Sequence, residues 1–508
     1  MRPCIAAVVA PVVVPLVAAL VPPTAAVRAQ EPPTPVFQPY TLDSGPVDHV
    51  PGGAAVVPVG DVHVPGTSSL QLWIGAFALP GGSRLRLTGV RDGAVQWFSA
   101  RSLRDYQQVS AFFNGDRVRV ELLPAAGTAS NRVVVTKVRI GEAAATTEGI
   151  CGASDTRVLS SDPRVGRIGS CCTTFLVDER NLVTAGHCLG GTGGAIVHFN
   201  VPLSDAGGAA QYPPPDDQYA LLAGSLTSVN GGLGNDYAVV ATVRNSNTGR
   251  YPGEAQGSWF APTPVPPGPA PMQWTVTGYG TTAVNPTWSL AQKSLTGPRQ
   301  TQSSALLQFF ITVTGCNSGS PVIGSNGTDV HGVVTHAGCG ATSGSNYGTG
   351  LGLGAFQLAL QGLQRSTVAG TFGTFGTGCG GAAGTPQLLP GGTPDLGSAV
   401  TLTVSGLEPG GDRFGLLLLG TSDTDWNGTP LPLDLAPLAM DGCALRVEPL
   451  LSYALSTGFG TAQLTLPIPG QPEFLGAALH AQHFAHDPTA ANAAQVVASN
   501  GVRIRLGN

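Results

Sequence analysis

Three short segments of the chain contain residues that together can carry out acyl transfer. They are residues 184–188 (Thr-Ala-Gly-His-Cys), 235–240 (Asn-Asp-Tyr-Ala-Val-Val) and 315–321 (Gly-Cys-Asn-Ser-Gly-Ser-Pro). A serine hydroxyl becomes a good nucleophile when an imidazole takes its proton, and a buried carboxylate fixes the tautomer of that imidazole. The chain supplies these groups in the order His187, Asp236 and Ser318. We therefore predict a base, an orienting carboxylate and a nucleophile at these positions.

The residues beside the serine suit the same chemistry. Gly319 follows Ser318 and permits a tight turn that exposes the hydroxyl. In such a turn the backbone amides of Cys316 and Ser318 can point together at an oxyanion that develops on the substrate. The sequence thus predicts an oxyanion hole made of these two amides.

The flanks of the three candidates resemble the chymotrypsin/trypsin superfamily of serine peptidases. The Asn-Ser-Gly-Ser-Pro form at residues 317–321 is similar to the secreted bacterial branch, which includes the glutamyl endopeptidases. The resemblance implies a serine endopeptidase that works through an acyl-enzyme and needs no cofactor. It also implies an all-β domain of two six-stranded antiparallel barrels, with the site in the cleft between them.

Two residues of the serine loop depart from the animal members of the superfamily. Cys316 stands where the family usually has glycine, but only its amide is needed for the oxyanion hole. Asn317 stands where animal enzymes have an aspartate that pairs with a newly cut N-terminal amine. The resemblance therefore implies that this chain is not activated by that pairing.

The resemblance also places a primary substrate pocket. Its expected residues are Thr312 at the base, Val334, Thr335, His336 and Ala337 in the wall, and Asn346 at the back. Thr335 corresponds to a small hydroxyl residue that bonds the catalytic aspartate in the family. Thr312 lacks the charge of the aspartate found in trypsin-type pockets, and a cationic substrate side chain would have no buried partner there.

The charge preference of the pocket has two interpretations. Glutamyl endopeptidases hold an acidic side chain with a pocket histidine, but the matching position here is Val334. His336 lies two residues further on and either contacts an acidic side chain or serves as a wall residue without reading charge. We expect a preference for uncharged residues, with acidic preference as the alternative.

The chain has nine cysteines, and Cys4 lies in the apparent signal segment. The remaining eight are typical of an oxidising compartment. The resemblance implies a Cys172–Cys188 bridge beside the histidine. We expect Cys316–Cys339 to join the serine loop to the pocket wall, Cys379–Cys443 to lie in the last segment, and Cys151–Cys171 to remain by elimination. Because no cysteine or histidine group has ligand spacing, including His480, His483 and His486, we expect no metal site.

The start of the chain reads as a secretory signal. Arg2 precedes a mostly apolar run interrupted by Pro11 and Pro15, and a small-residue cleavage site ends at Ala29. We therefore expect a signal peptide over residues 1–29 and a secreted protein, extracellular or periplasmic. The prolines and the length argue against a membrane span.

Charge and composition narrow the partners. Charged residues make up 11% of the chain and the formal net charge is −5, which gives no basic patch for nucleic acid. The 71 glycines and 42 prolines indicate many turns and a β-rich chain. We expect protein or peptide substrates, no nucleic acid and no membrane span.

Period-two patterns predict β-sandwiches on both sides of the peptidase domain. We expect an N-terminal β-sandwich, as an accessory domain or a propeptide, plus a linker over residues 30–149, with residues 30–48 poorly ordered. The trypsin-like serine peptidase domain follows over residues 150–370, and a linker with a C-terminal β-sandwich over residues 371–508. The terminal sandwiches have a surface or a glycan as a possible ligand.

Two other functions fit parts of the same pattern. A catalytically inactive protease-fold protein used for binding or adhesion would keep the fold and the flanking sandwiches. An esterase would keep the triad and differ in substrate. The presence of all three triad residues favours the peptidase.

Overall fold

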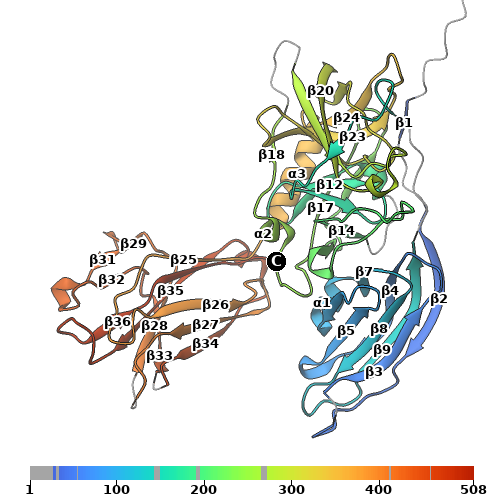
Figure 1. Cartoon of the computed structure of the whole chain (residues 1–508). Helices are drawn as coiled ribbons and strands as arrows, with labels where there is room; N and C mark the ends of the chain where they lie inside the picture. The colour runs from blue at the N-terminus through green and yellow to red at the C-terminus, as the bar shows by residue number, and fades with distance from the viewer. Residues whose placement is uncertain are drawn as a thin grey trace, which may run out of the picture.

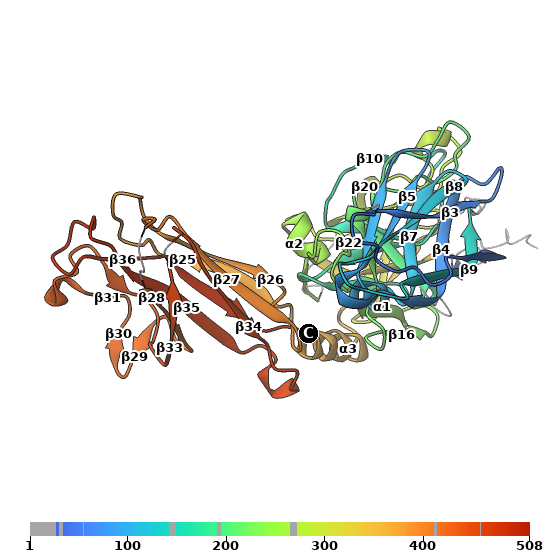
Figure 2. The same ribbon diagram turned by 90° about the horizontal axis from the view of Figure 1, so that it is seen from below.

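A computed structural model describes residues 27–29, 34–53, 55–141, 149–189, 195–264, 272–410, 414–457 and 459–508. The expected signal segment and the linker near residue 145 lie mostly outside this described part. The chain forms three β-rich bodies in sequence order, and the last extends to one side of the other two (Figures 1 and 2). The predicted all-β fold class is confirmed. In the described part, no helix has the length and apolar character needed to cross a membrane.

The N-terminal body is a sandwich of two four-stranded antiparallel sheets. One has the order β2 (Val36–Asp43), β9 (Arg132–Ile140), β4 (Ser69–Ala78) and β7 (Val109–Asn114); the other has β3 (Val57–His63), β8 (Arg117–Leu123), β5 (Arg84–Gly89) and β6 (Val95–Phe98). Leu85 and Leu87 are fully buried between the sheets, as their alternation with arginines predicts. The expected disorder of residues 30–48 is wrong for β2, because this strand pairs with β9 along the sandwich edge.

The second barrel of the central body is closed. Its strands run in the order β23 (Asp329–Ala337), β22 (Pro321–Ile323), β19 (Gln273–Gly278), β20 (Lys293–Gln302), β21 (Leu306–Phe309) and β24 (Asn346–Gly350). Pairing of β23 with β24 closes the ring. The short strands β1 (Arg28–Ala29), β10 (Val158–Leu159) and β18 (Ala261–Pro262) add to its outer edges.

The first barrel is an open sheet of seven strands. Their order is β15 (Gln218–Ala220), β14 (Ile196–His198), β11 (Val165–Ile168), β12 (Thr173–Leu176), β13 (Asn181–Thr184), β17 (Asp236–Ala241) and β16 (Thr227–Asn230). A closed six-stranded ladder was expected here. The edge strand β15 instead meets the N-terminal sandwich: the carbonyl of Gln218 accepts a bond from the Tyr106 hydroxyl at 2.9 Å, and its side chain accepts one from the Phe112 amide at 2.8 Å.

The N-terminal sandwich and the first barrel share one hydrophobic cluster. Ile196, Ala220 and Val243 of the barrel pack with the sandwich core. The ring of Phe112 stacks on Tyr212 with centroids 4.5 Å apart and nearly parallel planes. The short helix α1 (Ala100–Asp105) lies at the same interface (Figure 1).

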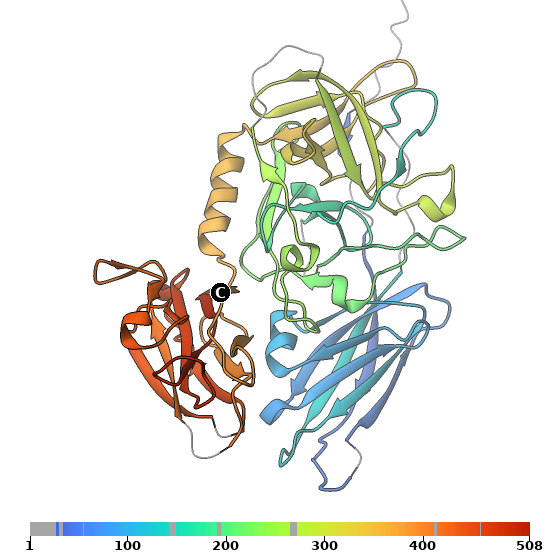
Figure 3. The ribbon, with the colours of Figure 1, turned by 60° about the vertical axis from the view of Figure 1, so that its left-hand side comes forward.

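Two helices accompany the central body. The short α2 is Pro252–Gln256, and α3 is Gly354–Ser366. Phe356, Leu360 and Leu363 form the buried face of α3, as the sequence pattern predicts. Phe356 also stacks on Tyr237 at 4.5 Å, which fixes the helix against strand β17. Figure 3 shows α3 running along this body toward the C-terminal sandwich.

The C-terminal body is a second β-sandwich. One sheet contains β25 (Thr371–Phe375), β37 (Gly501–Arg505), β35 (Ala478–His486), β28 (Phe414–Gly420) and β33 (Leu451–Ser456), with β36 (Val496–Ala498) on β35; the other contains β26 (Gln387–Gly392), β27 (Ala399–Ser405) and β34 (Ala462–Pro467). Two small hairpins add β29 (Asp425–Trp426), β30 (Thr429–Pro430), β31 (Leu433–Asp434) and β32 (Ala444–Leu445). An ion pair of 3.0 Å between Arg244 and Asp395 joins this body to the first barrel.

The expected linker at residues 371–378 is instead mostly strand. Residues Thr371–Phe375 form β25, which pairs with β37, and Phe372 packs against the core of the sandwich. Its glycine and threonine content resembles that of a linker, but Phe372 and Phe375 favour a strand, and pairing with β37 holds the segment in the sheet.

Four disulfides are present in the described part of the chain. Cys172–Cys188 and Cys379–Cys443 are the expected pairs. The other two expected pairs, Cys316–Cys339 and Cys151–Cys171, are wrong.

The four remaining cysteines form the pairs Cys171–Cys316 and Cys151–Cys339 instead of the expected ones. The turn before β12 runs beside the serine loop, where the Thr173 hydroxyl donates to the carbonyl of Cys316 at 3.0 Å. The residues that follow Cys151 and Cys339 are joined by a backbone hydrogen bond of 3.2 Å. Each of these four cysteines therefore pairs with the cysteine that the packing of the central body places beside it.

Candidate active site

Strand pairing brings the candidate histidine and aspartate together. In the β13–β17 ladder, Thr184 lies opposite Ala238. His187 follows β13 on a single 3-10 turn, and Asp236 is the first residue of β17. Gly186 lets this turn pass close to β16, because a Cβ there would lie 2.0 Å from the carbonyl oxygen of Val229.

The carboxylate of Asp236 is fully buried and makes three hydrogen bonds to the turn that carries His187. One oxygen accepts bonds from the amides of Gly186 at 2.6 Å and His187 at 3.1 Å. The other lies 2.6 Å from Nδ1 of His187. A carboxylate can only accept here, so the proton of the neutral imidazole lies on Nδ1. Nε2 is then the acceptor, and it has no hydrogen-bond partner among the described residues.

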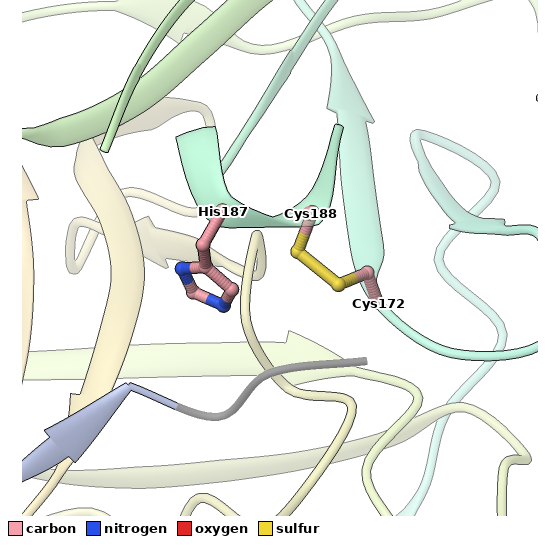
Figure 4. Close-up of side chains that lie close together, drawn as sticks. All are labelled: Cys172, His187 and Cys188. Atoms are coloured by element: carbon pink, nitrogen blue, oxygen red, sulfur yellow. A yellow bond between two sulfur atoms is a disulfide. The ribbon is translucent and has the colours of Figure 1, made fainter. Parts of the chain in front are cut away.

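The serine loop lies against the same turn. The amide of Thr173 donates to the carbonyl of Ser318 at 2.8 Å, and Sγ of Cys188 lies 3.7 Å from that carbonyl oxygen. The predicted Cys172–Cys188 bridge thus ties the histidine turn to the strand that supports Ser318 (Figure 4).

The backbone of the serine loop makes a tight turn at Gly319, but Ser318 is fully buried, whereas the sequence predicts an exposed hydroxyl. Gly319 has φ +91°, and a Cβ there would lie 1.9 Å from the carbonyl oxygen of Thr173. Cys316 has φ +74°, a conformation that costs a non-glycine residue on the order of 1 kcal/mol. Its bond to Cys171 helps to hold this conformation.

The only metal-like grouping in the described residues consists of Cys172, His187 and Cys188. Both sulfurs belong to one disulfide, so neither can act as a thiolate ligand (Figure 4). This group does not fit a metal.

The six predicted pocket residues lie together around β23 and β24. Val334, Thr335, His336 and Ala337 end β23, Asn346 begins β24, and Thr312 follows β21; all six are buried.

The chain itself occupies the polar groups at the base and back of this region. The amide of Cys151 donates to the Thr312 hydroxyl at 3.1 Å. Asn346 donates to the carbonyls of Gly149 at 2.7 Å and Ile311 at 2.8 Å. The segment at residues 149–151 therefore packs against Thr312 and Asn346, a contact that the sequence did not indicate.

Thr335 and His336 form a local pair. The hydroxyl of Thr335 lies 2.9 Å from Nδ1 of His336. The family resemblance implied a hydrogen bond between Thr335 and Asp236. Among the described residues, no such bond is found. Instead, the amide of Asp236 donates to the Thr349 hydroxyl at 3.0 Å, a partner that the sequence did not single out.

Burial lowers the pKa of His336 below its ordinary value, with the nearby charge of Asp236 opposing this effect. The ring is therefore neutral near pH 7. A neutral imidazole offers no full positive charge to an acidic substrate side chain.

Strand β1 lies along the free edge of β23. Arg28 pairs with Ala337 and Ala29 with His336 in antiparallel register. Figure 1 shows β1 beside β23 and β24. An extended peptide can add to a sheet edge in this way. The expected signal cleavage after Ala29 would remove this strand.

One family model and two solved structures are similar to parts of this chain. The family model described as Trypsin matches residues 157–350. A solved structure of a Glu endopeptidase in complex with MPD has 18% identity and a TM-score of 0.33, covering 42% of this chain and 99% of its own. The human heparin binding protein has 15% identity and a TM-score of 0.31, covering 42% of this chain and 97% of its own. A search of curated proteins finds no match.

The two structural likenesses are too weak to bear on function. The family match stands on residues that include His187, Asp236 and Ser318. The closed second barrel and the open first sheet have the chymotrypsin-like arrangement. The central part of the chain, residues 157–350, therefore matches the Trypsin family model and has a chymotrypsin-like fold.

Proposed function

We propose that the chain is a secreted serine endopeptidase with His187, Asp236 and Ser318 as its catalytic triad. The observation that carries this proposal is the buried Asp236 carboxylate, 2.6 Å from Nδ1 of His187, with Nε2 left as the acceptor. That arrangement orients the imidazole for removal of a serine proton.

The reaction follows from these roles. The Ser318 hydroxyl oxygen attacks the scissile carbonyl carbon while Nε2 of His187 takes the proton. The amides of Cys316 and Ser318 stabilise the oxyanion. Collapse breaks the C–N bond, and the imidazolium gives its proton to the leaving amine. Water, deprotonated by His187, then attacks the acyl-enzyme ester, and the serine oxygen regains the proton.

We propose a preference for an uncharged side chain in the primary pocket. Thr312 supplies no charge at the base, and burial holds the pKa of His336 below its ordinary value. A basic or acidic substrate side chain would therefore enter without a compensating charge.

The flanking bodies are proposed to remain part of the mature protein. Residues 30–149, 150–370 and 371–508 form its three parts after signal removal. The shared hydrophobic cluster and the Phe112–Tyr212 stack support an accessory role for the N-terminal sandwich, because its loss would expose this apolar surface. Four disulfides are typical of extracellular proteins and support secretion.

A panel of peptides and esters tests the proposal on the secreted protein. Ser318→Ala should lower kcat for peptides by up to about 10⁶-fold, whereas the exposed-surface control Ser304→Ala should match the wild type. Uncharged residues before the cut should be preferred over acidic and basic ones. Ester cleavage without peptide cleavage would indicate an esterase, and inert wild-type protein would indicate the binding or adhesion function.

A further inference from the structure

A buried arginine lies directly behind the serine loop. The side chain of Arg157 is 2% exposed. Its Nη1 donates to Oδ1 of Asn317 at 2.8 Å and to the Thr314 hydroxyl at 3.0 Å. Its Nη2 donates to the carbonyl of Thr281 at 2.6 Å, and Nε and Nη2 both bond Asp155, at 2.8 and 2.6 Å. All five guanidinium N–H groups thus have a partner.

The aspartate keeps this buried cation neutralised. Burial raises the pKa of Asp155, but the hydrogen bonds and charge of Arg157 outweigh burial and leave the pKa below its ordinary value. A buried charge is stable when it is both paired and fully hydrogen-bonded. The Arg157–Asp155 pair is therefore a rigid, buried ion pair rather than a mobile surface contact.

Asn317 connects the Arg157–Asp155 pair to the serine loop. Its Oδ1 also accepts the amide of Thr314 at 3.1 Å, and its Nδ2 lies 3.2 Å from the Ser320 hydroxyl oxygen. Its own amide donates to the Thr314 carbonyl at 3.0 Å. Asn317 stands between Cys316 and Ser318, whose amides form the proposed oxyanion hole. Holding the carboxamide therefore holds the peptide planes on both sides.

The surroundings leave no space for another group at this point. A Cβ on Gly280 would lie 1.9 Å from Oδ1 of Asn317 and 2.4 Å from Nη1 of Arg157. A carboxamide also serves this position in a way that a carboxylate cannot, because only its Nδ2 can donate to Ser320. An ammonium group arriving from a new chain end would find the carboxamide oxygen already occupied.

We propose that Arg157 is a positioning residue, an internal cation that holds Asn317 and keeps the oxyanion amides in place without cleavage of the chain near residue 150. This inference rests on the proposed peptidase function. It predicts that the folded chain, with the N-terminal sandwich still covalently attached, has a complete catalytic site.

A second arginine of the same domain provides a matched control. Arg164 bonds Asp162 through Nε at 2.9 Å and Nη2 at 2.7 Å, the same spacing and fork as Asp155 and Arg157. Its Nη1 donates to the carbonyl of Gly327 at 2.9 Å instead of to the serine loop. Arg164→Ala therefore removes an equivalent ion pair without touching Asn317.

The test measures peptide hydrolysis by the full secreted chain. Arg157→Ala should lower kcat by about 10²-fold, as for loss of one oxyanion donor, with KM changed much less. Arg164→Ala should leave kcat within about threefold of wild type. Millimolar guanidinium chloride should restore much of the kcat of Arg157→Ala, whereas sodium chloride at equal ionic strength should not.

Three results would overturn the inference. One is wild-type kcat in Arg157→Ala, and another is a folded Arg157→Ala protein whose lost activity guanidinium does not restore. The third is wild-type activity that appears only after a cut near residue 150, as mass spectrometry would reveal. If Arg157→Ala does not fold, Asn317→Ala replaces it and should show the same fall in kcat; wild-type kcat in that variant would overturn the inference. A wild-type protein without any hydrolysis would instead refute the proposed function.

Discussion

Replacing Asp236 with asparagine should reverse the tautomer of His187 while leaving the fold intact. Oδ1 of Asp236 receives two backbone amides, from Gly186 and His187, so the amide oxygen of an asparagine must take this place. Its NH₂ group then faces Nδ1, where the carboxylate oxygen now lies at 2.6 Å. Nδ1 must accept, the proton moves to Nε2, and Nε2 can no longer take the proton of Ser318.

The expected loss of kcat at neutral pH is about 10⁴-fold, which corresponds to about 5.4 kcal/mol of transition-state stabilisation. The assay compares kcat on the best peptide substrate for Asp236→Asn and for the exposed-site control Asp441→Asn, with thermal unfolding of each. The control should match the wild type. A folded Asp236→Asn protein within tenfold of wild-type kcat would refute the assigned tautomer and the role of Asp236.

Three further predictions follow from other contacts. Replacing both Cys171 and Cys316 with alanine should lower the free energy of unfolding by roughly 5 kcal/mol, because the bridge spans 145 residues; chemical denaturation measures this, and an unchanged midpoint would contradict it. A chain that retains residues 27–29 should cleave long peptides more slowly than one starting at residue 30, because β1 occupies the edge of β23; equal rates would contradict this. Burial lowers the pKa of His483 from 6.5 to about 4. Between these pH values only the unfolded state binds a proton at this imidazole. The free energy of unfolding should therefore fall by about 3 kcal/mol as the pH drops through that range. His483→Gln should remove that loss, as followed by tryptophan fluorescence during urea unfolding, and an equal loss in the variant would exclude His483 as its source.

The local patterns in the sequence were enough to predict much of the fold. Alternation such as that of Leu85 and Leu87 identified strands because one face of each strand must be buried. The helical spacing of Phe356, Leu360 and Leu363 likewise matched the buried face of α3. In these cases the period of the apolar residues alone carries the structural information.

The candidate site was predictable where short flanks determine the geometry. The Ala-Gly-His-Cys segment requires glycine for its close approach, and His187 lies 2.6 Å from Asp236 as the pattern predicts. The disulfide partners of Cys151 and Cys171 were not predictable, because cysteine spacing does not say which loops pack side by side. The hydroxyl partner of Asp236 was also missed, since Thr335 and Thr349 lie on neighbouring strands and only the packing selects between them.

The contact of Arg157 with Asn317 is another feature that spacing alone cannot give. The two residues are 160 positions apart, and their hydrogen bond depends on how the start of the domain folds behind the second barrel. One sequence feature fits this contact: asparagine stands at position 317, where the animal enzymes that the serine loop resembles have an acidic residue. A change of that kind at a buried site requires a different partner.

The most direct test of the central claim is labelling of the secreted protein with a fluorophosphonate probe, followed by mass spectrometry. The sample should be the folded protein that starts at residue 30 and so lacks strand β1. It should be compared with the same chain carrying Ser318→Ala. An activated serine predicts one adduct, mapped to Ser318 and absent from the variant. A folded wild-type chain that acquires no adduct, or one that is labelled equally after Ser318→Ala, would contradict the assignment of Ser318 as the nucleophile.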